Sequence, residues 1–266
     1  NPYVSMEYYA YHTVHELFLY GDLTLQQWID IFNRIRFVCD DFKRYTVHDD
    51  NIRQALEEMY LTKTLQRFEK MKKDERFLAF FESPITVNEK KYQPLEKVIV
   101  ALETAIPEML YDVDTFSIIH GDLCFANIMV DSNFSFIKVI DPRGKFGTYD
   151  IYGDFRYELA KLFHSVDGKY DFIIKDLFDL DYNTETSCIN YHVQDRRREF
   201  NLYKVFLDTF AAEIGNDLRK IELIEALLFL SMIPLHGESI RHQMAMLGTG
   251  LEILNRVVNI QVEGEE

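Results

Sequence analysis

The sequence predicts an α+β fold in which many helices surround one short strand-rich section. Apolar residues recur at helical spacing over most of the 266 residues. Between about residues 116 and 141 this pattern gives way to three short β-type runs that are separated by turn residues. Hydrophobic residues make up 47% of the chain, which is enough to bury a sizeable core.

Helices are expected to dominate the first half of the chain. An amphipathic helix is predicted over about residues 24–45, with an apolar face formed by Leu25, Trp28, Ile29, Phe32 and Ile35. Further helices are predicted at about 51–72, in a shorter stretch up to Phe81, and at about 95–110, where Pro107 breaks or kinks the end. Residues 84–93, just before Pro94, are predicted to form a loop or a weak hairpin.

The strand-rich section and the helices after it complete the predicted fold. Strands are expected at about 116–119, 127–130 and 136–140, with a turn at residues 131–133. Asp154 is predicted to begin a helix, and later helices are expected at about 190–214, 217–232 and 237–260. The 217–232 helix is apolar nearly all round, which predicts that it is buried.

Composition and charge argue against several functional classes. The net charge of −15 disfavours binding to nucleic acid, because phosphate backbones need clustered Lys and Arg. No apolar run is long enough to span a bilayer. The three cysteines show no zinc-ligand spacing, and His236 and His242 lie six residues apart rather than four. Sparse cysteines and the lack of a signal peptide favour a cytoplasmic location.

The strongest chemical signals all lie in the strand-rich section. Residues 120–127 read His-Gly-Asp-Leu-Cys-Phe-Ala-Asn, which places the carboxylate of Asp122 and the amide of Asn127 five residues apart in a loop. Asp141 follows Asp122 by nineteen residues, at the end of the third predicted strand. Two acids and an amide are therefore expected on adjacent strand–loop connections.

This set of side chains suits phosphoryl transfer from ATP. The reaction needs a hydroxyl held in line and magnesium to neutralise charge on the phosphates. Magnesium takes hard oxygen ligands and keeps several waters, so a carboxylate and an amide oxygen are sufficient protein ligands. A separate carboxylate must accept the hydroxyl proton. Asp122, Asn127 and Asp141 are therefore candidates for these three roles, and the resemblance given in the next paragraph implies Asp122 as the catalytic base and Asn127 and Asp141 as magnesium ligands.

The loop also resembles those of known kinases. Its spacing matches the protein-kinase loop H-R-D-L-x-x-x-N, which precedes a metal-binding Asp in D-F-G, at His120, Asp122, Leu123 and Asn127. The His-Gly-Asp form, with Gly where protein kinases have Arg, resembles the aminoglycoside phosphotransferase and choline kinase family. The run from residue 120 to about 170 is also similar to phosphotransferase-like proteins encoded with bacterial capsule and surface-polysaccharide enzymes.

The resemblance implies a fold, cofactors and roles for individual residues. Residues 1–266 would form the mostly helical C-terminal lobe of a protein-kinase-like fold, with a small β-hairpin carrying the catalytic loop. ATP and Mg²⁺ would be the cofactors. Residues 4–9 resemble the hinge strand whose backbone contacts adenine, which points to Glu7 and Tyr8 for ATP binding. The run 153–160 is similar to the family's next helix start, so Asp154 would brace the catalytic loop as well as cap the helix.

Two further residues near the motif have expected roles. His120 is expected to be a packed, hydrogen-bonded support rather than a base. Arg143 is a candidate for bidentate contact with a phosphate or an anionic substrate, and its alternative is an ion pair with an acid such as Asp150.

The chain departs from the family at its beginning. It has no G-x-G-x-x-G loop and no strand Lys of the V-A-I-K kind, and it starts at Asn1 without an initiator Met. We therefore expect an N-terminal lobe or a fused upstream domain before Asn1, and little turnover by this chain alone.

The expected function is ATP-dependent phosphorylation of a hydroxyl on a small molecule, such as a sugar, an amino alcohol or a polysaccharide precursor. Specificity is expected to lie in a helical insert at residues 45–94 and in the C-terminal helices. Two alternatives stay open. A nucleotide-binding pseudokinase or scaffold would keep the fold without turnover, and a metal-dependent hydrolase would use the same carboxylates without nucleotide.

Overall fold

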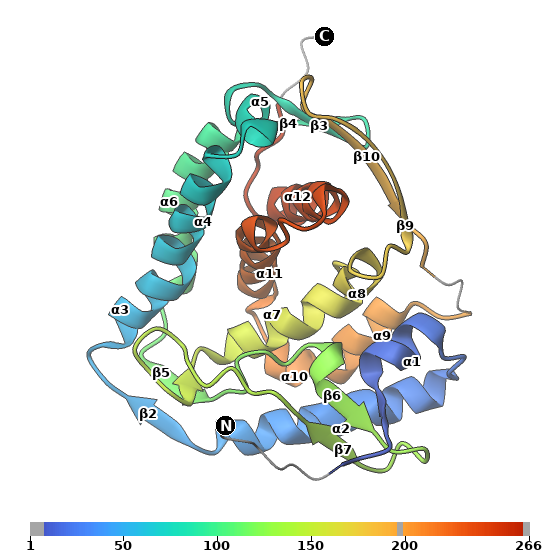
Figure 1. Cartoon of the computed structure of the whole chain (residues 1–266). Helices are drawn as coiled ribbons and strands as arrows, with labels where there is room; N and C mark the ends of the chain where they lie inside the picture. Colours follow the sequence, from blue (N-terminus) through green and yellow to red (C-terminus); the bar gives the residue numbers. More distant parts are fainter. Residues whose placement is uncertain (1–7, 196–198, 263–266) are drawn as a thin grey trace, which may run out of the picture.

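The structure has an α+β fold in which helices predominate (Figure 1). A computed structural model describes residues 8–195 and 199–262. The α-helices within these ranges are α1 (Val14–Tyr20), α2 (Leu25–Lys43), α3 (Ile52–Leu56), α4 (Lys63–Lys72), α5 (Leu78–Glu82), α6 (Leu95–Leu110), α7 (Phe155–Val166), α8 (Tyr170–Ile173), α9 (Leu202–Thr209), α10 (Ala211–Ile214), α11 (Leu218–Met232) and α12 (Ile240–Val257). None of the helices in these ranges combines the length and the apolar character that a bilayer crossing needs.

Side-chain caps fix where several of these helices begin. Thr24 accepts a hydrogen bond from the Gln27 amide at the start of α2, and Ser239 accepts one from the His242 amide at the start of α12. Asp154 caps α7 in the same way, as the sequence predicts. These caps satisfy amide groups that have no partner within the helix, so each helix start is defined by sequence.

Residues 119–127, which include the predicted catalytic residues, form a loop that we call the candidate loop. A three-stranded antiparallel sheet lies on either side of it. One has the order β1-β6-β7 and the other has the order β2-β5-β8. Their strands are β1 (His12–Thr13), β6 (Ile128–Val130), β7 (Ile137–Val139), β2 (Thr46–His48), β5 (Thr115–Ile118) and β8 (Tyr152–Gly153). Because β5 leads into the loop and β6 leads out of it, residues 119–127 connect the two sheets. The three strands expected around this loop are confirmed.

A third, four-stranded sheet was not expected from the sequence. It has the order β4-β3-β10-β9 and comprises β4 (Lys90–Tyr92), β3 (Ile85–Val87), β10 (Cys188–Val193) and β9 (Phe178–Asn183). The prediction that the section at about 116–141 is the only strand-rich one is therefore wrong, and so is a helix beginning at residue 190. Residues 84–93 do form a hairpin, and its strand β3 pairs in parallel with β10.

The predicted insert, residues 45–94, contains this hairpin as well as helices. Its long expected helix is divided by η1, a π-helical segment at Glu57–Thr62 between α3 and α4. Irregular turns of this kind occur often at functional sites. The insert continues through the 3₁₀ turn η2 (Glu75–Phe77) and α5 to β3 and β4. Helix α6 then runs to Leu110 without ending at Pro107.

The core beneath the candidate loop is aromatic. Phe125, from the 3₁₀ turn η3 (Phe125–Asn127), packs edge-on against Phe18 and stacks on Trp28. Both Phe125 and Leu123 are fully buried. Helix α11 is buried as predicted, and it packs between α7 and α12. Burying one aromatic side chain contributes about 2–3 kcal/mol, so these contacts hold the loop firmly against the helices.

Candidate functional site

The candidate loop presents its polar residues by alternation. Leu123 and Phe125 point into the core, whereas Asp122 and Asn127 remain partly exposed. Backbone hydrogen bonds from Cys124 to the Asp122 carbonyl and from Asn127 to the Cys124 carbonyl, at 2.8 and 3.0 Å, tighten the turn between them. The loop thus holds a carboxylate and an amide on its accessible side.

Asp122 and Asn127 are in direct contact. The Asn127 side-chain amide donates to the Asp122 backbone carbonyl at 2.9 Å and to the Asp122 carboxylate at 3.2 Å. Both bonds use Nδ2, so the Oδ1 oxygen of Asn127 is free to bind a cation. The structure therefore brings together two of the three residues that the sequence assigns to phosphoryl transfer.

The Asp122 carboxylate also forms an ion pair that the sequence did not suggest. Lys161, on α7, places Nζ 2.7 Å from Oδ1 of Asp122, and its side chain is nearly buried. Burial alone would raise the pKa of Asp122, but the charge and hydrogen bond of Lys161 outweigh it and hold that pKa below its ordinary value. Asp122 is therefore a carboxylate at neutral pH, with a fixed orientation.

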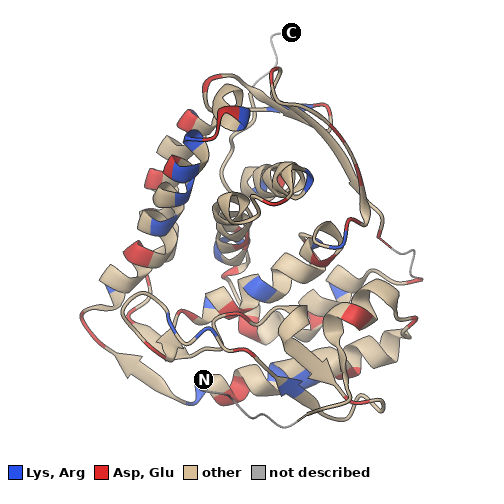
Figure 2. Cartoon of the chain, in the orientation of Figure 1, with Lys and Arg blue, Asp and Glu red and all other residues tan. Residues whose placement is uncertain are grey.

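Glu158 is the residue that braces the loop. Its fully buried carboxylate accepts hydrogen bonds from the backbone amides of His120 and Gly121, at 2.9 and 2.7 Å. Burial raises the pKa of Glu158 to about 7, although the two amide donors act in the opposite direction. Figure 2 shows that α7 carries charges of both signs along a helix that the burial pattern places in the core. Glu158 and Lys161 thus reach the loop from one buried helix.

Asp154 does not brace the loop, which corrects the role that the family resemblance implies. Its carboxylate caps α7, pairs with Arg156 at 2.8 Å and accepts a hydrogen bond from Tyr60 at 2.9 Å. Tyr60 lies in the π-helical segment η1, so Asp154 ties the insert to the start of α7. The bracing carboxylate is Glu158, one turn further along the same helix.

His120 is a packed support, as expected. The His120 Nδ1 atom accepts from the Asp122 amide at 3.3 Å, so the hydrogen lies on Nε2, which donates to the Ile140 carbonyl at 2.9 Å. Burial lowers the pKa of His120, and the Ile140 carbonyl and the carboxylates of Asp122 and Asp141 offset this only in part. A neutral imidazole therefore joins the loop to the segment that carries Asp141.

Asp141 lies next to the loop through the backbone. The Ile140 amide donates to the Asn127 carbonyl at 3.0 Å, which places Asp141 directly after the residue that faces Asn127. Asp141 has a φ of 57°, a left-handed conformation that is uncommon for residues other than glycine and occurs often at functional sites. Its carboxylate is exposed and has no hydrogen-bond or ion-pair partner in the described ranges.

Arg143 borders a cavity of about 280 Å³ next to the loop. Its backbone amide donates to the His120 carbonyl at 2.8 Å, and its guanidinium donates to the Tyr157 hydroxyl at 2.9 Å. Among the described residues it makes no ion pair with Asp150, so that expected alternative is wrong. The cavity is lined from the insert and from the β7–β8 connection by Glu58, Met59, Thr62, Lys63, Gln66, Arg143, Lys145 and Gly147.

Lys63 gives this cavity a positive charge that depends on pH near neutrality. Burial lowers its pKa to about 7, and the neighbouring charges of Arg143, Lys161 and Arg67 act in the same direction. The negative charge of Asp122 raises the pKa of Lys63, so Asp122 lies near enough to this cavity to interact with it electrostatically. The cavity is therefore suited to an anionic group of a bound molecule.

Gly121 is required by the conformation of the loop. Its φ is 78°, and a Cβ atom at this position would lie 3.0 Å from Cβ of Arg143. We predict that Gly121→Ala lowers the free energy of unfolding by about 1–2 kcal/mol, because a side chain is strained in this conformation. Urea denaturation would measure the loss. Gly237→Ala is the matched control, since a Cβ atom there meets nothing within 4 Å; an equal loss in both variants would contradict the prediction.

The residues predicted to contact adenine, Glu7 and Tyr8, lie near the beginning of the chain. Glu7 falls outside the described residues. Tyr8 is 87% exposed, and neither Tyr8 nor Tyr9 belongs to a strand. The described part of the hinge strand expected at residues 4–9 is therefore not a strand, and the first strand in the described ranges is β1. The binding of adenine here stays a prediction.

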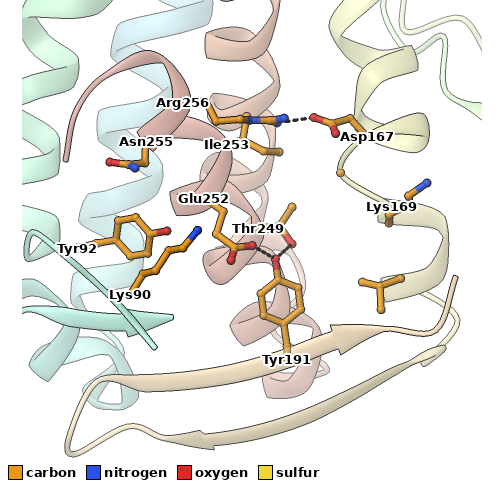
Figure 3. Close-up of a pocket in the computed structure, with 12 residues that line it drawn as sticks. Lys90, Tyr92, Asp167, Lys169, Tyr191, Thr249, Glu252, Ile253, Asn255 and Arg256 are labelled. Atoms are coloured by element: carbon orange, nitrogen blue, oxygen red, sulfur yellow. Dashed lines mark hydrogen bonds and ion pairs between the residues drawn. The ribbon is translucent and has the colours of Figure 1, made fainter. Parts of the chain in front are cut away.

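A second cavity, of about 340 Å³, lies between α12 and the strands β4 and β10 (Figure 3). Tyr191 points across it, donates to Glu252 at 2.6 Å and accepts from Thr249 at 3.0 Å. Figure 3 also shows Arg256 paired with Asp167 on the far side. No residue of the predicted catalytic set lines this cavity, although part of the insert does.

Comparisons with known proteins do not place this chain in a family. No model of a known family matches it, and no curated protein is similar to it in sequence. The likeness to kinases therefore rests on the residues of the loop and its surroundings.

Proposed function

We propose that this chain carries the catalytic residues of an ATP-dependent kinase that phosphorylates a hydroxyl on a small molecule. The observation that supports this most is the contact between Asp122 and Asn127, in a loop joined by hydrogen bonds to the segment that carries Asp141. The kinase-like lobe, ATP, Mg²⁺ and a cytoplasmic location belong to the same proposal.

The side chains fit a magnesium ion of this kind. Asn127 offers Oδ1 because both of its hydrogen bonds use Nδ2, and Asp141 offers a carboxylate that has no partner in the part of the chain that is described. Both are hard oxygen donors of the type that Mg²⁺ prefers. When bound, the ion would neutralise charge on the phosphates of ATP.

Asp122 would act on the acceptor. Its partly exposed carboxylate can receive a hydrogen bond from an incoming hydroxyl and then take the proton as the phosphorus–oxygen bond forms. A low pKa makes Asp122 a weak base, which is sufficient because the transition state of phosphoryl transfer is loose and needs the proton removed late. Lys161 keeps the carboxylate charged and oriented.

The cavity beside the loop is the place we propose for part of the acceptor. Lys63 and Arg143 would contact an anionic group there, as in a phosphorylated or carboxylated sugar. This agrees with the expectation that the insert at residues 45–94 determines substrate specificity, since Lys63 begins α4 within that insert. The adenine would be bound through residues 7 and 8.

The test is phosphate transfer by the full-length polypeptide that contains this chain. The protein is incubated with γ-labelled ATP, Mg²⁺ and separate pools of sugars, amino alcohols and sugar phosphates, and label in the acceptor is measured. Transfer to one pool supports the proposal. ATP binding without transfer to any acceptor would favour a pseudokinase, and phosphate release from a substrate without nucleotide would favour a hydrolase; either result would contradict the proposal.

Anion binding at the cavity is predicted to depend on pH through Lys63. Its pKa of about 7 means that the ammonium form, which attracts anions, is lost as the pH rises through neutrality. Sulfate keeps a constant charge over this range, so its Kd should increase about tenfold between pH 6 and pH 8. Calorimetric titration would measure this. Lys63→Met should abolish the dependence and Lys145→Met should retain it; a dependence that survives Lys63→Met would contradict the assignment.

A further inference from the structure

A cluster of metal-ligating side chains lies away from the candidate loop. His236, Glu238 and His242 each offer one ligand atom, and these atoms lie within 4.8 Å of one another. His236 follows the 3₁₀ turn η4 (Ile233–Leu235), Glu238 lies in the next turn, and His242 is in the first turn of α12. The sequence spacing of six disfavoured a zinc helix, but a tight turn between two helices brings the two histidines together.

Local hydrogen bonds fix this turn. The His236 amide donates to the Ile233 carbonyl at 3.2 Å, and the Ser239 amide donates to the His236 carbonyl at 3.1 Å. The Ser239 hydroxyl then accepts from the His242 amide as the cap of α12. The positions of both histidines are therefore set by backbone geometry and do not depend on a ligand to order them.

The two imidazole rings are held and share an acidic environment. The side chains of His236 and His242 are 19% and 12% exposed, and the ring of His242 packs near Phe178. Glu238 lies 3.1 Å from Nδ1 of His236, and Asp176 lies 3.0 Å from Nε2 of His242. Two ordered imidazoles and two carboxylates thus converge from the η4–α12 turn and from the connection between α8 and β9.

We propose that His236, Glu238 and His242 bind a divalent transition metal of the zinc class, with Asp176 holding the ring of His242. Imidazole nitrogen with carboxylate oxygen is a donor set that suits Zn²⁺ or Co²⁺ rather than Mg²⁺. A carboxylate against a liganding histidine orients the ring and strengthens binding. The metal would fix the turn between η4 and α12, which Asp176 links to the start of the β9–β10 hairpin, and the site is independent of the proposed kinase reaction.

Metal binding to the chelator-treated protein tests this site. Zn²⁺ titration by calorimetry should show one tight equivalent, and Co²⁺ should give the enhanced visible d–d absorption bands of a four- or five-coordinate ion. Glu238→Gln and His242→Ala should each weaken Zn²⁺ binding by about 100-fold, and Asp176→Asn by about 10-fold. Glu238 is 66% exposed at its side chain, so its replacement leaves the fold intact and keeps the test valid even if His242→Ala unfolds the protein.

Two matched variants exclude other zinc sites. His48→Ala removes an exposed histidine elsewhere and should leave Zn²⁺ affinity unchanged. Asp141→Asn removes the predicted magnesium ligand and should also leave it unchanged. The proposal is overturned if the protein shows no saturable Zn²⁺ or Co²⁺ binding, or if binding persists at full affinity in Glu238→Gln and His242→Ala.

Discussion

Replacing Asp122 with Asn is expected to reduce phosphoryl transfer by the full-length polypeptide by on the order of 10²–10⁴-fold. The amide cannot take the proton of the attacking hydroxyl, whereas the contacts of Asn127 with the Asp122 backbone carbonyl remain. The measurement is the initial rate of label transfer from ATP with saturating Mg²⁺. Nucleotide affinity should change little, because the proposed mechanism places Asp122 at the acceptor and not at the nucleotide.

The same substitution also leaves Lys161 without its counterion. Because Asp122 keeps 36% of its side chain exposed, we expect a stability loss of roughly 2–3 kcal/mol, less than for a fully buried pair. The double variant Asp122→Asn with Lys161→Met removes both charges and should recover most of this stability without recovering activity. A double variant that regains transfer would show that the single variant fails through folding and not through the loss of a base.

Replacing Glu158 with Ala is expected to give the largest loss of stability. It leaves the buried amides of His120 and Gly121 without an acceptor, which costs roughly 2–4 kcal/mol. In a chain of this size that corresponds to a fall in Tm of about 5–15 °C. Transfer should also fall by on the order of 10²-fold, because a shift of about 1 Å in the position of Asp122 is enough to misalign the reacting groups.

Hydrogen exchange tests whether Glu158 or Asp154 braces the candidate loop. Exchange at the His120 and Gly121 amides should accelerate in Glu158→Ala, and less so in Glu158→Gln, which keeps one acceptor oxygen. Asp154→Ala is the control, since it removes the α7 cap and the pair with Arg156 but leaves both loop amides bonded. Faster loop exchange in Asp154→Ala than in Glu158→Ala would restore the bracing role to Asp154.

Regular patterns made much of the fold predictable. The 24–45 helix has a clear apolar face and appears as α2, and the 95–110 helix appears as α6 despite Pro107. The hairpin β9–β10 was missed although apolar and polar residues alternate along β9, because β10 was merged with a helical pattern further on. Its turn did carry a local signal, since the Asn183 side chain accepts from the Glu185 and Thr186 amides.

The candidate site was predictable only in part, because some of its residues lie far from the motif in the sequence. Asp122 and Asn127 belong to one short motif, so their spacing alone indicated that they would meet. Glu158 and Lys161 act from a helix some forty residues later, and sequence spacing does not tell which face of α7 meets the loop. The available signal was two charged residues, three apart, on a helix that is otherwise suited to burial.

The parallel pairing of β3 with β10 has a consequence for biosynthesis. Thr86 faces Cys188, so β3 leaves the ribosome about a hundred residues before its partner exists. The hairpin strand β4 gains its own outer partner later still. The Gln93 amide donates to the Ile260 carbonyl, and the Val262 amide donates to the Lys91 carbonyl. An apolar edge that includes Ile85 and Val87 is thus unpaired on the nascent chain until β10 has been synthesised, and an unpaired strand edge of this kind can pair with other chains.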